Sequence, residues 1–483
     1  MPPAVVDRSV LPEPGFLIGA DKITTHDGEV YEHRYAATGE VTYAVPLAGQ
    51  GEVDAAVAAA RAALPAWKRM PGNERRRLML AFAAAVRTST SLAPVITVEN
   101  AYPLAFTPYF TNWVAELFEF NAGYADKIGG EVVATFPGPA FDYTLDEPYG
   151  VVAVIVPWNG PFVSFGQWLA PALAAGNTIV IKPPEMAPYT CLALAELALE
   201  VGFPPGVINV VPGGAVAGTA LTSHPDVNKI CFTGSGGTAS RIISASAPNL
   251  TPTAFELGGK SARIVFADAD LQAAAQRTLL GTGQACIAGS RVLVEAPVYD
   301  QLVEMSAAMA KQVPMGDPFA AGTMVGPVIS QGHADRILGF VERAKECGTG
   351  RLVTGGERVG GELADGYFLA PTIFADVENS AEIAQEEIFG PVTAFMRFET
   401  EEEAVAIAND SQYGLAAHIE TNDLRRTHRM ARDLDAGTVW INGFVDLPVG
   451  APFGGVKRSG YGRQGGIWGI REFVQAKNVW MPL

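Results

Sequence analysis

Short apolar runs rich in β-branched residues, each followed closely by Pro or Gly, recur along the first half of this chain. Four of them are Val151–Val156, Thr178–Lys182, Val207–Val211 and Asn228–Phe232. Continuous apolar runs of this length are typical of strands buried on both faces of a parallel sheet. Helical patterns lie between them, as in βαβ units. The chain is therefore predicted to fold as an α/β protein with right-handed crossovers.

The same alternation continues in the second half of the chain. Helices are expected at 53–63, 74–87, 190–201 and 299–312, and further strands at 262–266, 393–398 and 438–442. Two α/β halves are expected to meet near residues 250–260. Because ligands collect at the carboxyl ends of strands in open α/β sheets, the Gly and Pro clusters of both halves are expected to lie at such ends.

Length and charge narrow the classes of partner. The chain has 483 residues, enough for about two or three domains, and a formal net charge of −17. Nucleic acids and anionic membrane surfaces attract basic patches, so neither is an expected partner. We expect neither a secretory signal nor a transmembrane helix, because no basic-then-apolar leader and no long uncharged apolar run is present.

Cysteine and histidine are scarce. Four cysteines and six histidines are spaced irregularly, without a C-x-x-C pair. A disulfide framework or a metal site is therefore not expected. A reducing cytoplasm is the expected compartment.

Cys286 stands in a glycine-rich stretch, 281–291, that is nearly free of charge, and Glu256 lies thirty residues upstream beside further glycines. A thiol nucleophile and a carboxylate base on flexible backbone are what covalent catalysis on a carbonyl requires. The alternative is that Cys286 is a buried structural residue, since free Cys is among the most buried residue types.

A second glycine pattern points to a dinucleotide. Gly234, Gly236 and Ala239 match G-x-G-x-x-G/A between an expected strand and a helix expected from Ser240 onward. Such a turn lets a pyrophosphate approach the backbone at a helix N-terminus, although glycines also make ordinary turns. Glu256 lies 20 residues past Gly236, where the pattern calls for a ribose-binding acid. Its role as base or ribose ligand therefore stays open, with Lys182 and Glu185 as alternative ribose ligands.

Taken together, these segments resemble the aldehyde dehydrogenase superfamily over essentially the whole chain. The matching segments, in the family's order, are 157–159, 182–185, 232–235, 256–260, 283–286, 386–391 and 452–460. The resemblance implies that Cys286 is the nucleophile, that Glu256 is the general base and that Asn159 helps to hold the oxyanion. The implied reaction oxidises an aldehyde to a carboxylic acid through a thiohemiacetal and a thioester, with hydride transfer to NAD or NADP.

The resemblance also implies a cofactor site. Lys182 and Glu185 would bind the adenosine ribose, Gly234 and Ser235 the pyrophosphate, and Glu387 and Phe389 the nicotinamide riboside. Pro157, Trp158 and Leu257 would complete the site. NAD is the expected cofactor because the Glu185 carboxylate repels a 2′-phosphate, and NADP stays open because Lys182 offsets that charge.

Two departures from the family pattern stand out. The segment from Glu256 to Cys286 is shorter than the family norm by about four residues, close to one helical turn, and the difference falls within 271–282. Gln464 stands where the family often has Glu. An alternative function follows: a catalytically impaired dinucleotide-binding or structural homologue. Acyl transfer to coenzyme A and cofactor-free cysteine hydrolysis are less favoured.

The substrate is expected to be a neutral, apolar or aromatic aldehyde, because no basic cluster accompanies the motifs. The aromatic residues considered for an aldehyde tunnel are Trp158, Phe162, Trp168, Phe444 and Phe453, with Phe110, Trp113 and Phe118 from the N-terminal helices.

The expected fold class is α/β, with three parts. A Rossmann-like parallel-sheet cofactor domain takes 1–130 and 147–255, and an α/β catalytic domain takes 256–452. A small β extension for oligomerisation takes 131–146 and 470–483, and 453–469 is a return segment. The extension is expected because prolines interrupt 131–149 and the tail reads as an extended strand, whose apolar edge invites subunit pairing. A homodimer or homotetramer is expected.

Overall fold

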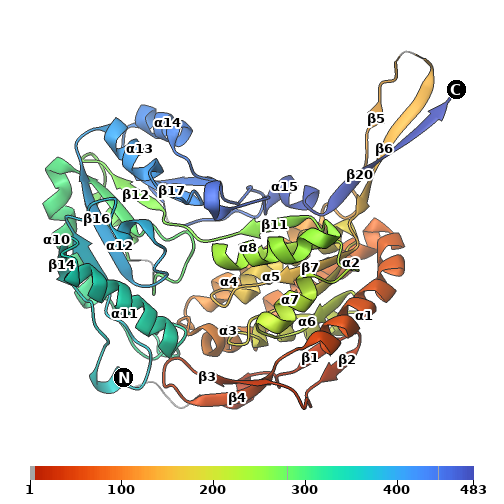
Figure 1. Cartoon of the computed structure of the whole chain (residues 1–483), viewed down its shortest axis with the longest axis horizontal. Coiled ribbons are helices and arrows are strands. Elements are labelled where there is room, and N and C mark those ends of the chain that lie inside the picture. The colour runs from red at the N-terminus through yellow and green to blue at the C-terminus, as the bar shows by residue number, and fades with distance from the viewer. Residues whose placement is uncertain (1–5, 137, 280, 444) are drawn as a thin grey trace.

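Two twisted sheets, one from each half of the chain, form the frame of the molecule, and a third small sheet extends away from it (Figure 1). The computed structural model describes residues 6–136, 138–279, 281–443 and 445–483. The two large sheets confirm the expected α/β class.

The first sheet has the strand order β19-β11-β10-β7-β8-β9-β1-β2. Its strands are β1 Phe16–Ile18, β2 Asp21–Ile23, β7 Val151–Ile155, β8 Thr178–Lys182, β9 Ile208–Val210, β10 Lys229–Thr233, β11 Thr253–Glu256 and β19 Gly460–Tyr461. The five central strands, from β11 to β9, are parallel. The chain passes outward from β7 through β8 to β9 and then returns to β10 and β11 on the other side. The strand order therefore reverses between β7 and β10, the position at which such sheets bind ligands.

Helices cover both faces of this sheet. They are α1 Gln50–Arg69, α2 Gly72–Thr88, α3 Leu92–Asn100, α4 Thr107–Ala122, α5 Pro161–Ala175, α6 Tyr189–Glu200, α7 Ala215–Thr222 and α8 Gly236–Ser246. Side chains of β7 alternate between two cores: Val152 and Val154 pack with α2, α4, α5 and α6, whereas Val151, Ala153 and Ile155 pack with α1, α7 and α8. This two-sided burial explains the continuous apolar runs in the sequence.

Two expected helix boundaries differ in the structure. The helix expected at 53–63 runs from Gln50 to Arg69 and contains Pro65. The helix expected from Ser240 begins at Gly236, because the Ser235 hydroxyl caps it by accepting a hydrogen bond from the backbone N–H of Thr238. The turn between β10 and α8 is therefore shorter than expected, because the helix starts at Gly236 and not at Ser240.

The second sheet has the order β14-β15-β16-β13-β12-β17-β18 and is parallel except for β14. Its strands are β12 Ala262–Val265, β13 Arg291–Glu295, β14 Arg351–Thr354, β15 Thr372–Ala375, β16 Val392–Phe398, β17 Ala416–Glu420 and β18 Thr438–Ile441. The accompanying helices are α9 Leu271–Arg277, α10 Tyr299–Gln312, α11 Gln331–Glu346, α12 Glu382–Gln385, α13 Glu401–Asn409, α14 Leu424–Asp433 and α15 Gly466–Arg471. The remaining single-turn helices are η1 Arg8–Val10, η2 Ala247–Asn249, η3 Ala296–Val298, η4 Gly361–Leu363 and η5 Lys457–Ser459.

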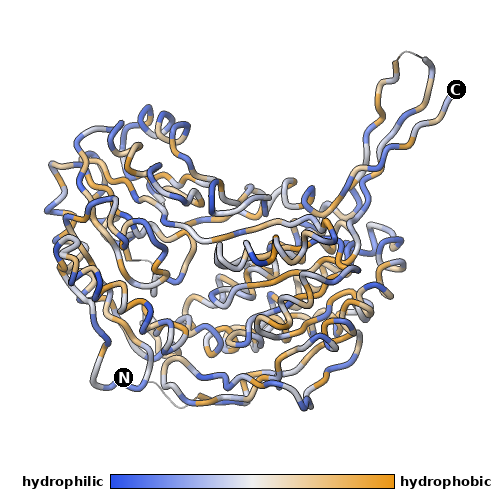
Figure 2. The backbone as a smooth tube through the Cα atoms, viewed as in Figure 1, coloured by the Kyte–Doolittle hydropathy of each residue, from blue (hydrophilic) through white to orange (hydrophobic). Residues whose placement is uncertain are grey.

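A three-stranded antiparallel sheet projects from the body (Figure 1). It joins β5 Val132–Val133 and β6 Ala140–Pro148 to the C-terminal β20 Val474–Pro482, which pairs with β6 along its whole length. Hydrophobic and hydrophilic residues alternate along it (Figure 2). The expected hairpin and tail strand are thus present. A separate hairpin near the N-terminus pairs β3 Val30–Arg34 with β4 Val41–Pro46.

No single helix in the described ranges has both the length and the apolar character needed to cross a bilayer, although α2 and α3 pass that test together as a pair bent by 73°.

Candidate active site

A cavity of about 1500 Å³ lies where the two large sheets face each other. All twelve residues that the sequence marked for catalysis or cofactor binding line it. They are Pro157, Trp158, Asn159, Lys182, Glu185, Gly234, Ser235, Glu256, Leu257, Cys286, Glu387 and Phe389. Residues separated by up to 232 positions, from Pro157 to Phe389, therefore meet in one site.

The second sheet meets the cavity in an unexpected orientation. Cys286 precedes β13, and Glu387 and Phe389 precede β16, so these residues lie at the amino ends of the strands. The expectation that both halves use carboxyl ends is wrong for this sheet. The reason is geometric: its amino edge faces the carboxyl edge of the first sheet across the cavity.

The nucleophile candidate Cys286 lies in the loop between α9 and β13 and is partly exposed to the cavity. Burial, followed by the nearby carboxylates of Glu387 and Glu256, raises the pKa of the thiol to about 12, while the backbone N–H groups of Cys286 and Ile287 act in the opposite direction. The thiol is therefore protonated at neutral pH and needs a base before it can attack.

Glycine is required in the same loop. Gly283 has φ +68°, and a Cβ placed there would lie 2.1 Å from the carbonyl oxygen of Gly390. Any side chain at this position would collide with the segment that carries Phe389. Gly283 therefore fixes how closely the loops before β13 and β16 approach each other.

Glu256 is the last residue of β11 and only 4% exposed. It pairs with Thr233 on one side and Gly460 on the other, so the expectation of a flexible backbone is wrong here. No described residue hydrogen bonds to either carboxylate oxygen. Burial raises the pKa of Glu256 well above its usual range, with Arg463 opposing that shift. A buried, unpartnered carboxyl with a raised pKa is well suited to accept a proton near neutral pH.

Two side-chain amides line the same cavity as this carboxyl and the thiol. The Asn159 side chain donates from Nδ2 to the carbonyl oxygen of Gln284 at 2.9 Å, which leaves its second N–H free to reach a ligand in the cavity. Gln464 is 2% exposed, lines the same cavity, and has no hydrogen-bond partner for its amide among the described residues. The position flagged in the sequence thus faces the reaction site.

The end of the cavity expected to bind a cofactor lies over the carboxyl ends of β8 and β10. Lys182 is buried and donates to the carbonyl oxygens of Pro183 and Gly213. Burial lowers the pKa of Lys182 to about 8, and Glu185 opposes the shift. Ser235 begins α8, an 11-residue helix whose N-terminus opens into the cavity. A basic and an acidic group beside a helix N-terminus suit the ribose and pyrophosphate of a dinucleotide.

Glu387 and Phe389 form the wall between this end and Cys286. Glu387 accepts a hydrogen bond from the Gly259 backbone N–H at 2.9 Å, and burial raises the pKa of its carboxyl to about 7. A Cβ at Gly258 would lie 2.1 Å from that carboxylate, so only glycine allows this approach. Phe389 has φ +60° and meets the Trp158 ring edge-on at 5.2 Å. Left-handed backbone at a non-glycine residue is concentrated at functional sites.

Sequence reasoning missed the residues that hold this wall. On α11, His333 Nε2 lies 2.8 Å from the carbonyl oxygen of Phe389, and Arg336 donates to the carbonyls of Ile388 and Glu387. The signal available was the spacing of three residues, which places His333 and Arg336 on one helix face. Their partners lie about fifty residues away, and nothing in the sequence indicated that distance.

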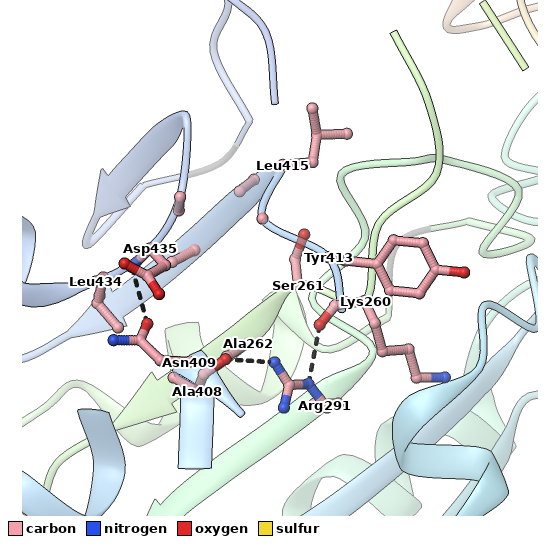
Figure 3. A pocket seen from close by; sticks show the side chains of 14 residues that line it. Lys260, Ser261, Ala262, Arg291, Ala408, Asn409, Tyr413, Leu415, Leu434 and Asp435 are labelled. Carbon is pink, nitrogen blue, oxygen red and sulfur yellow. Dashed lines mark hydrogen bonds between the residues drawn. The ribbon is translucent and has the colours of Figure 1, made fainter. Parts of the chain in front are cut away.

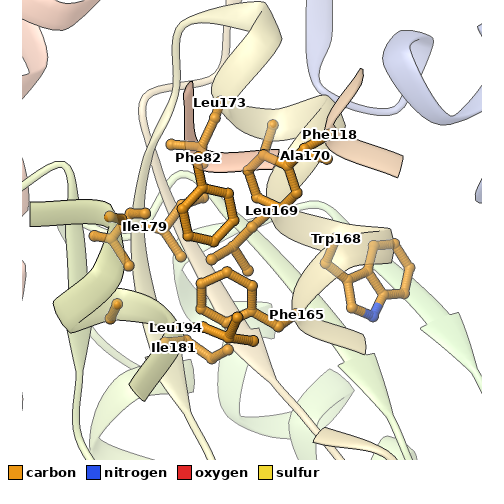
Figure 4. Close-up of a cluster of buried hydrophobic side chains, with 14 of the residues drawn as sticks. Phe82, Phe118, Phe165, Trp168, Leu169, Ala170, Leu173, Ile179, Ile181 and Leu194 are labelled. Atoms are coloured by element: carbon orange, nitrogen blue, oxygen red, sulfur yellow. The ribbon is translucent and has the colours of Figure 1, made fainter. Parts of the chain in front are cut away.

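Most of the expected tunnel aromatics do line the cavity: Trp158, Phe162, Phe453, Phe110 and Trp113. Two do not. Trp168 and Phe118 are at most 1% exposed and pack in the helical core of the first sheet (Figure 4). They were misassigned because helix period alone does not say which face meets a cavity. Phe444 lies outside the described residues. Tyr102, Phe106 and Tyr109 line the cavity as well.

A second, much smaller cavity lies at the amino ends of the second sheet. Its volume is about 10 Å³, and Lys260, Arg291, Asn409 and Asp435 are among its lining residues (Figure 3). It has room for about one water molecule and contains none of the twelve expected site residues. In the part of the chain that the structure describes, no group of three or more His, Cys, Asp or Glu residues could hold a metal ion.

The known proteins to which this chain is similar are aldehyde dehydrogenases. Residues 23–479 match the aldehyde dehydrogenase family profile. A mitochondrial aldehyde dehydrogenase of Equus caballus is 42% identical over 92% of this chain and 90% of its own length. A chloroplastic aminoaldehyde dehydrogenase of Arabidopsis thaliana is 42% identical over 92% and 91%. The crystal structure of betaine aldehyde dehydrogenase from Staphylococcus aureus in complex with NAD+ superimposes with a TM-score of 0.94 at 34% identity, covering 98% of this chain and 95% of that one.

Proposed function

Because this chain belongs to the aldehyde dehydrogenase family, we propose that Cys286, Glu256 and Asn159 carry out its reaction in the cavity between the two sheets. The reaction is the oxidation of an aldehyde to a carboxylic acid with NAD. The observation that carries the assignment of residues is their convergence: a thiol, an unpartnered buried carboxyl and an amide with a free N–H line one cavity.

The first step is attack by the Cys286 sulfur on the aldehyde carbon. Since the pKa of the thiol is raised to about 12, its proton must be removed as the bond forms. Glu256 accepts that proton, directly or through a water molecule, since no described residue occupies its carboxylate oxygens. The oxyanion is stabilised by the second Asn159 N–H and by the Cys286 backbone N–H. Each such donor lowers the barrier by about 3–4 kcal/mol.

Bound NAD supplies the hydride acceptor that converts the thiohemiacetal into a thioester. Lys182 and Glu185 would hold its adenosine ribose, and the N-terminus of α8 with Gly234 and Ser235 would hold its pyrophosphate. Glu387, Phe389, Trp158, Pro157 and Leu257 would enclose the nicotinamide riboside. The donor set fits: the Lys182 ammonium, the carboxylates of Glu185 and Glu387 and the N-terminus of α8 line the same cavity. Glu256 then activates the water that releases the acid.

We further propose a bulky apolar or aromatic aldehyde as the substrate. The cavity, about 1500 Å³, exceeds the upper range of about 1000 Å³ for single-ligand sites, so a cofactor and a large aldehyde fit together. Tyr102, Phe106, Tyr109, Phe110, Trp113, Phe162 and Phe453 line it. The Lys and Arg side chains among its described lining belong to β8, α8 and α11, near the proposed cofactor residues.

The projecting sheet supports a homodimer or homotetramer. Val132, Phe141, Leu145, Trp480 and Met481 are 41–75% exposed on it, an unusual amount of apolar surface for a monomer.

We propose that the chain divides into a cofactor domain of 1–130 and 147–255, a catalytic domain of 256–452, a return segment of 453–469 and an oligomerisation extension of 131–146 with 470–483. The cytoplasm is the proposed compartment, since all four cysteines are free thiols. Light scattering of the purified protein tests whether it forms a homodimer or a homotetramer.

The function is tested by following NADH absorbance with a panel of aliphatic and aromatic aldehydes. Cys286→Ala should abolish NADH formation while NAD binding persists. Cys347→Ala is the matched control, because Cys347 is exposed and does not line the cavity. A wild-type enzyme that binds NAD but forms no NADH with any aldehyde would instead favour the catalytically impaired homologue. Release of free acid without coenzyme A separates hydrolysis from acyl transfer.

A further inference from the structure

The segment that carries Cys286 lacks regular secondary structure. Between the end of α9 at Arg277 and the start of β13 at Arg291, none of the described residues belongs to a helix or strand. This loop starts near the carboxyl ends of the second sheet and ends at the amino ends. With no ladder of backbone hydrogen bonds to place it, its position depends on side-chain anchors.

The upstream anchor is a buried ion pair. Arg277, the last residue of α9, has Nη1 2.5 Å from Oε2 of Glu420, the last residue of β17. The other carboxylate oxygen of Glu420 accepts a hydrogen bond from Arg263 on β12. The side chains of Glu420 and Arg263 are 2% and 4% exposed. Two guanidinium groups thus share one carboxylate away from water, a geometry that strongly fixes all three.

The downstream anchor is His418 on β17. Its Nε2 lies 3.0 Å from the carbonyl oxygen of Ile287, the residue that follows Cys286, and its Nδ1 lies 3.4 Å from Nη2 of Arg263. Because a guanidinium only donates, Nδ1 accepts and Nε2 carries the proton that it donates to Ile287. The Trp440 ring stacks on the imidazole at 5.1 Å and 21°, which fixes the ring plane.

The charge state of His418 agrees with this arrangement. Burial and the Arg263 guanidinium lower the pKa of His418 to about 3, so the ring is neutral at neutral pH. Gly289 packs directly on the cluster, since a Cβ there would lie 3.1 Å from both Arg263 Cβ and His418 Cδ2. The loop is therefore seated on the face of the sheet that Arg263 and His418 share as register partners.

Residue 287 links this cluster to the thiol. Its carbonyl accepts from His418, while its backbone N–H opposes the effect of burial and lowers the pKa of the Cys286 thiol. The carbonyl and the N–H of Ile287 belong to adjacent peptide units, so a change at His418 would free the first and let rotation about the Ile287 backbone displace the second.

We propose that Arg277, Glu420 and His418, connected through Arg263, are positioning residues that hold the Cys286 loop at both ends and keep the sulfur in its reactive geometry. This inference rests on the proposed function, in which Cys286 is the nucleophile. None of the four residues of this cluster lines either cavity, so the cluster acts on the reaction only through the loop that it holds.

The test is alkylation of Cys286 by iodoacetamide in a Cys347→Ser background, where the other two cysteines are fully buried. His418→Leu removes the donor to Ile287, and His418→Gln restores an N–H near the position of Nε2. Arg277→Gln releases the upstream end and leaves Glu420 paired with Arg263. Arg351→Gln, in an exposed ion pair with Asp376 on the same sheet, is the matched control.

For His418→Leu we expect the rate of alkylation at pH 8 to fall about tenfold, which corresponds to a rise of about one unit in the pKa of the thiol, and kcat to fall about tenfold, because the thiolate loses a donor. KM for the aldehyde should change by less than about threefold, and His418→Gln should recover most of the loss. Arg277→Gln should lower kcat similarly. The proposal is overturned if His418→Leu or Arg277→Gln lowers the unfolding temperature but leaves the alkylation pH profile and kcat as in wild type.

Alkylation needs neither aldehyde nor cofactor, so its outcome is separate from that of the proposed function. If the wild-type protein forms no NADH, the proposed function fails, whereas the alkylation profile still reports whether the cluster positions the thiol. If NADH forms and the profiles of all variants coincide, only the positioning role fails.

Discussion

The two large sheets contribute to one cavity from opposite ends of their strands. In the first sheet, Asn159, Lys182 and Ser235 lie at or just beyond strand carboxyl ends, where short turns lead into helices. In the second, Cys286 and Glu387 lie in loops before strand amino ends. A strand end fixes the residues attached to it directly, whereas a loop entering a strand must be fixed by side chains from elsewhere.

The second sheet supplies those side chains from its own helices and strands. His333 and Arg336 on α11 hold the carbonyls of 387–389, and Arg277 with His418 holds the ends of the Cys286 loop. Each of these donors is positively charged or an imidazole, and each acceptor is a backbone carbonyl or the Glu420 carboxylate. We infer that hydrogen bonds from polar side chains position the site loops of the second sheet, whereas tight turns position the site residues of the first sheet.

The largest expected effect lies at the end of a first-sheet strand. Glu256→Gln keeps the size of the side chain but removes the base, so kcat should fall about 10²–10⁴-fold. The unfolding temperature should stay near that of wild type, because no described residue hydrogen bonds to the carboxylate. Since the pKa of Glu256 is raised well above its usual range, wild-type kcat/KM should increase with pH through that pKa.

In the variant, that dependence on Glu256 should disappear from the pH profile. Steady-state kinetics across pH 5–9 measures the pH dependence of kcat/KM. This range is centred on about pH 7, near which the pKa of an effective general base lies. A Glu256→Gln enzyme with wild-type kcat would show that another group accepts the proton.

The sequence predicted four of the eight strands of the first sheet, β7, β8, β9 and β10, each to within one residue at either end, because runs such as Val151–Val156 are apolar on both faces and stop at Pro157. It did not predict β1, β2, β11 or β19. In the second sheet β12, β16 and β18 were expected, whereas β13, β14, β15 and β17 were not. In β17 the neutral ring of His418 interrupts the apolar pattern, and its place is explained only by the pairing of β17 with β12, which sets it beside Arg263. Trp168 was misplaced for a related reason: a helix buried all round gives no sign of which ring meets a cavity.

The second prediction compares one buried ion pair from each sheet. Glu420→Gln leaves Arg263 and Arg277 without a counter-charge, so the free energy of unfolding should fall by about 3–5 kcal/mol. Glu472→Gln breaks the pair with Lys229 in the first sheet, where the Lys229 side chain is 4% exposed but Glu472 is 24% exposed, so water can reach the pair. The loss there should be smaller, about 1–3 kcal/mol. Urea denaturation of both variants measures the difference, and equal losses would contradict the asymmetry between the sheets.

Two buried histidines, one in each half of the chain, should make the stability of the fold depend on pH. The pKa of His418 is lowered to about 3 and that of His33, in β3, to about 4, both by burial. In the unfolded chain both rings take up a proton below about pH 6.5, whereas the folded rings stay neutral, so stability falls as pH falls from about 6.5. Each ring should cost about 2 kcal/mol at pH 5.

Replacement of His418 by Gln removes one of these two contributions. The unfolding free energy of His418→Gln should therefore decrease less between pH 7 and pH 5 than that of wild type, by about 2 kcal/mol. Denaturant titrations at the two pH values provide the measurement. His33→Gln is the matched variant in the first half of the chain, and it should remove a similar amount without changing alkylation of Cys286. A parallel change in both alkylation profiles would mean that the two halves do not respond separately.

The smallest expected effect lies at the rim of the first sheet, where Glu185 follows β8 and is only partly buried. In the proposed cofactor site its carboxylate would face the adenosine ribose beside Lys182, so it would repel a 2′-phosphate through water rather than through protein. Glu185→Gln should therefore improve kcat/KM for NADP relative to NAD by about tenfold, or about 1.4 kcal/mol. Raising the ionic strength should reduce the same preference in wild type, because an exposed charge is screened. Kinetics with both cofactors at low and high salt measures both effects. If Glu185→Gln leaves the NAD preference unchanged while salt has no effect, the preference is set by the shape of the turn after β8 and not by charge.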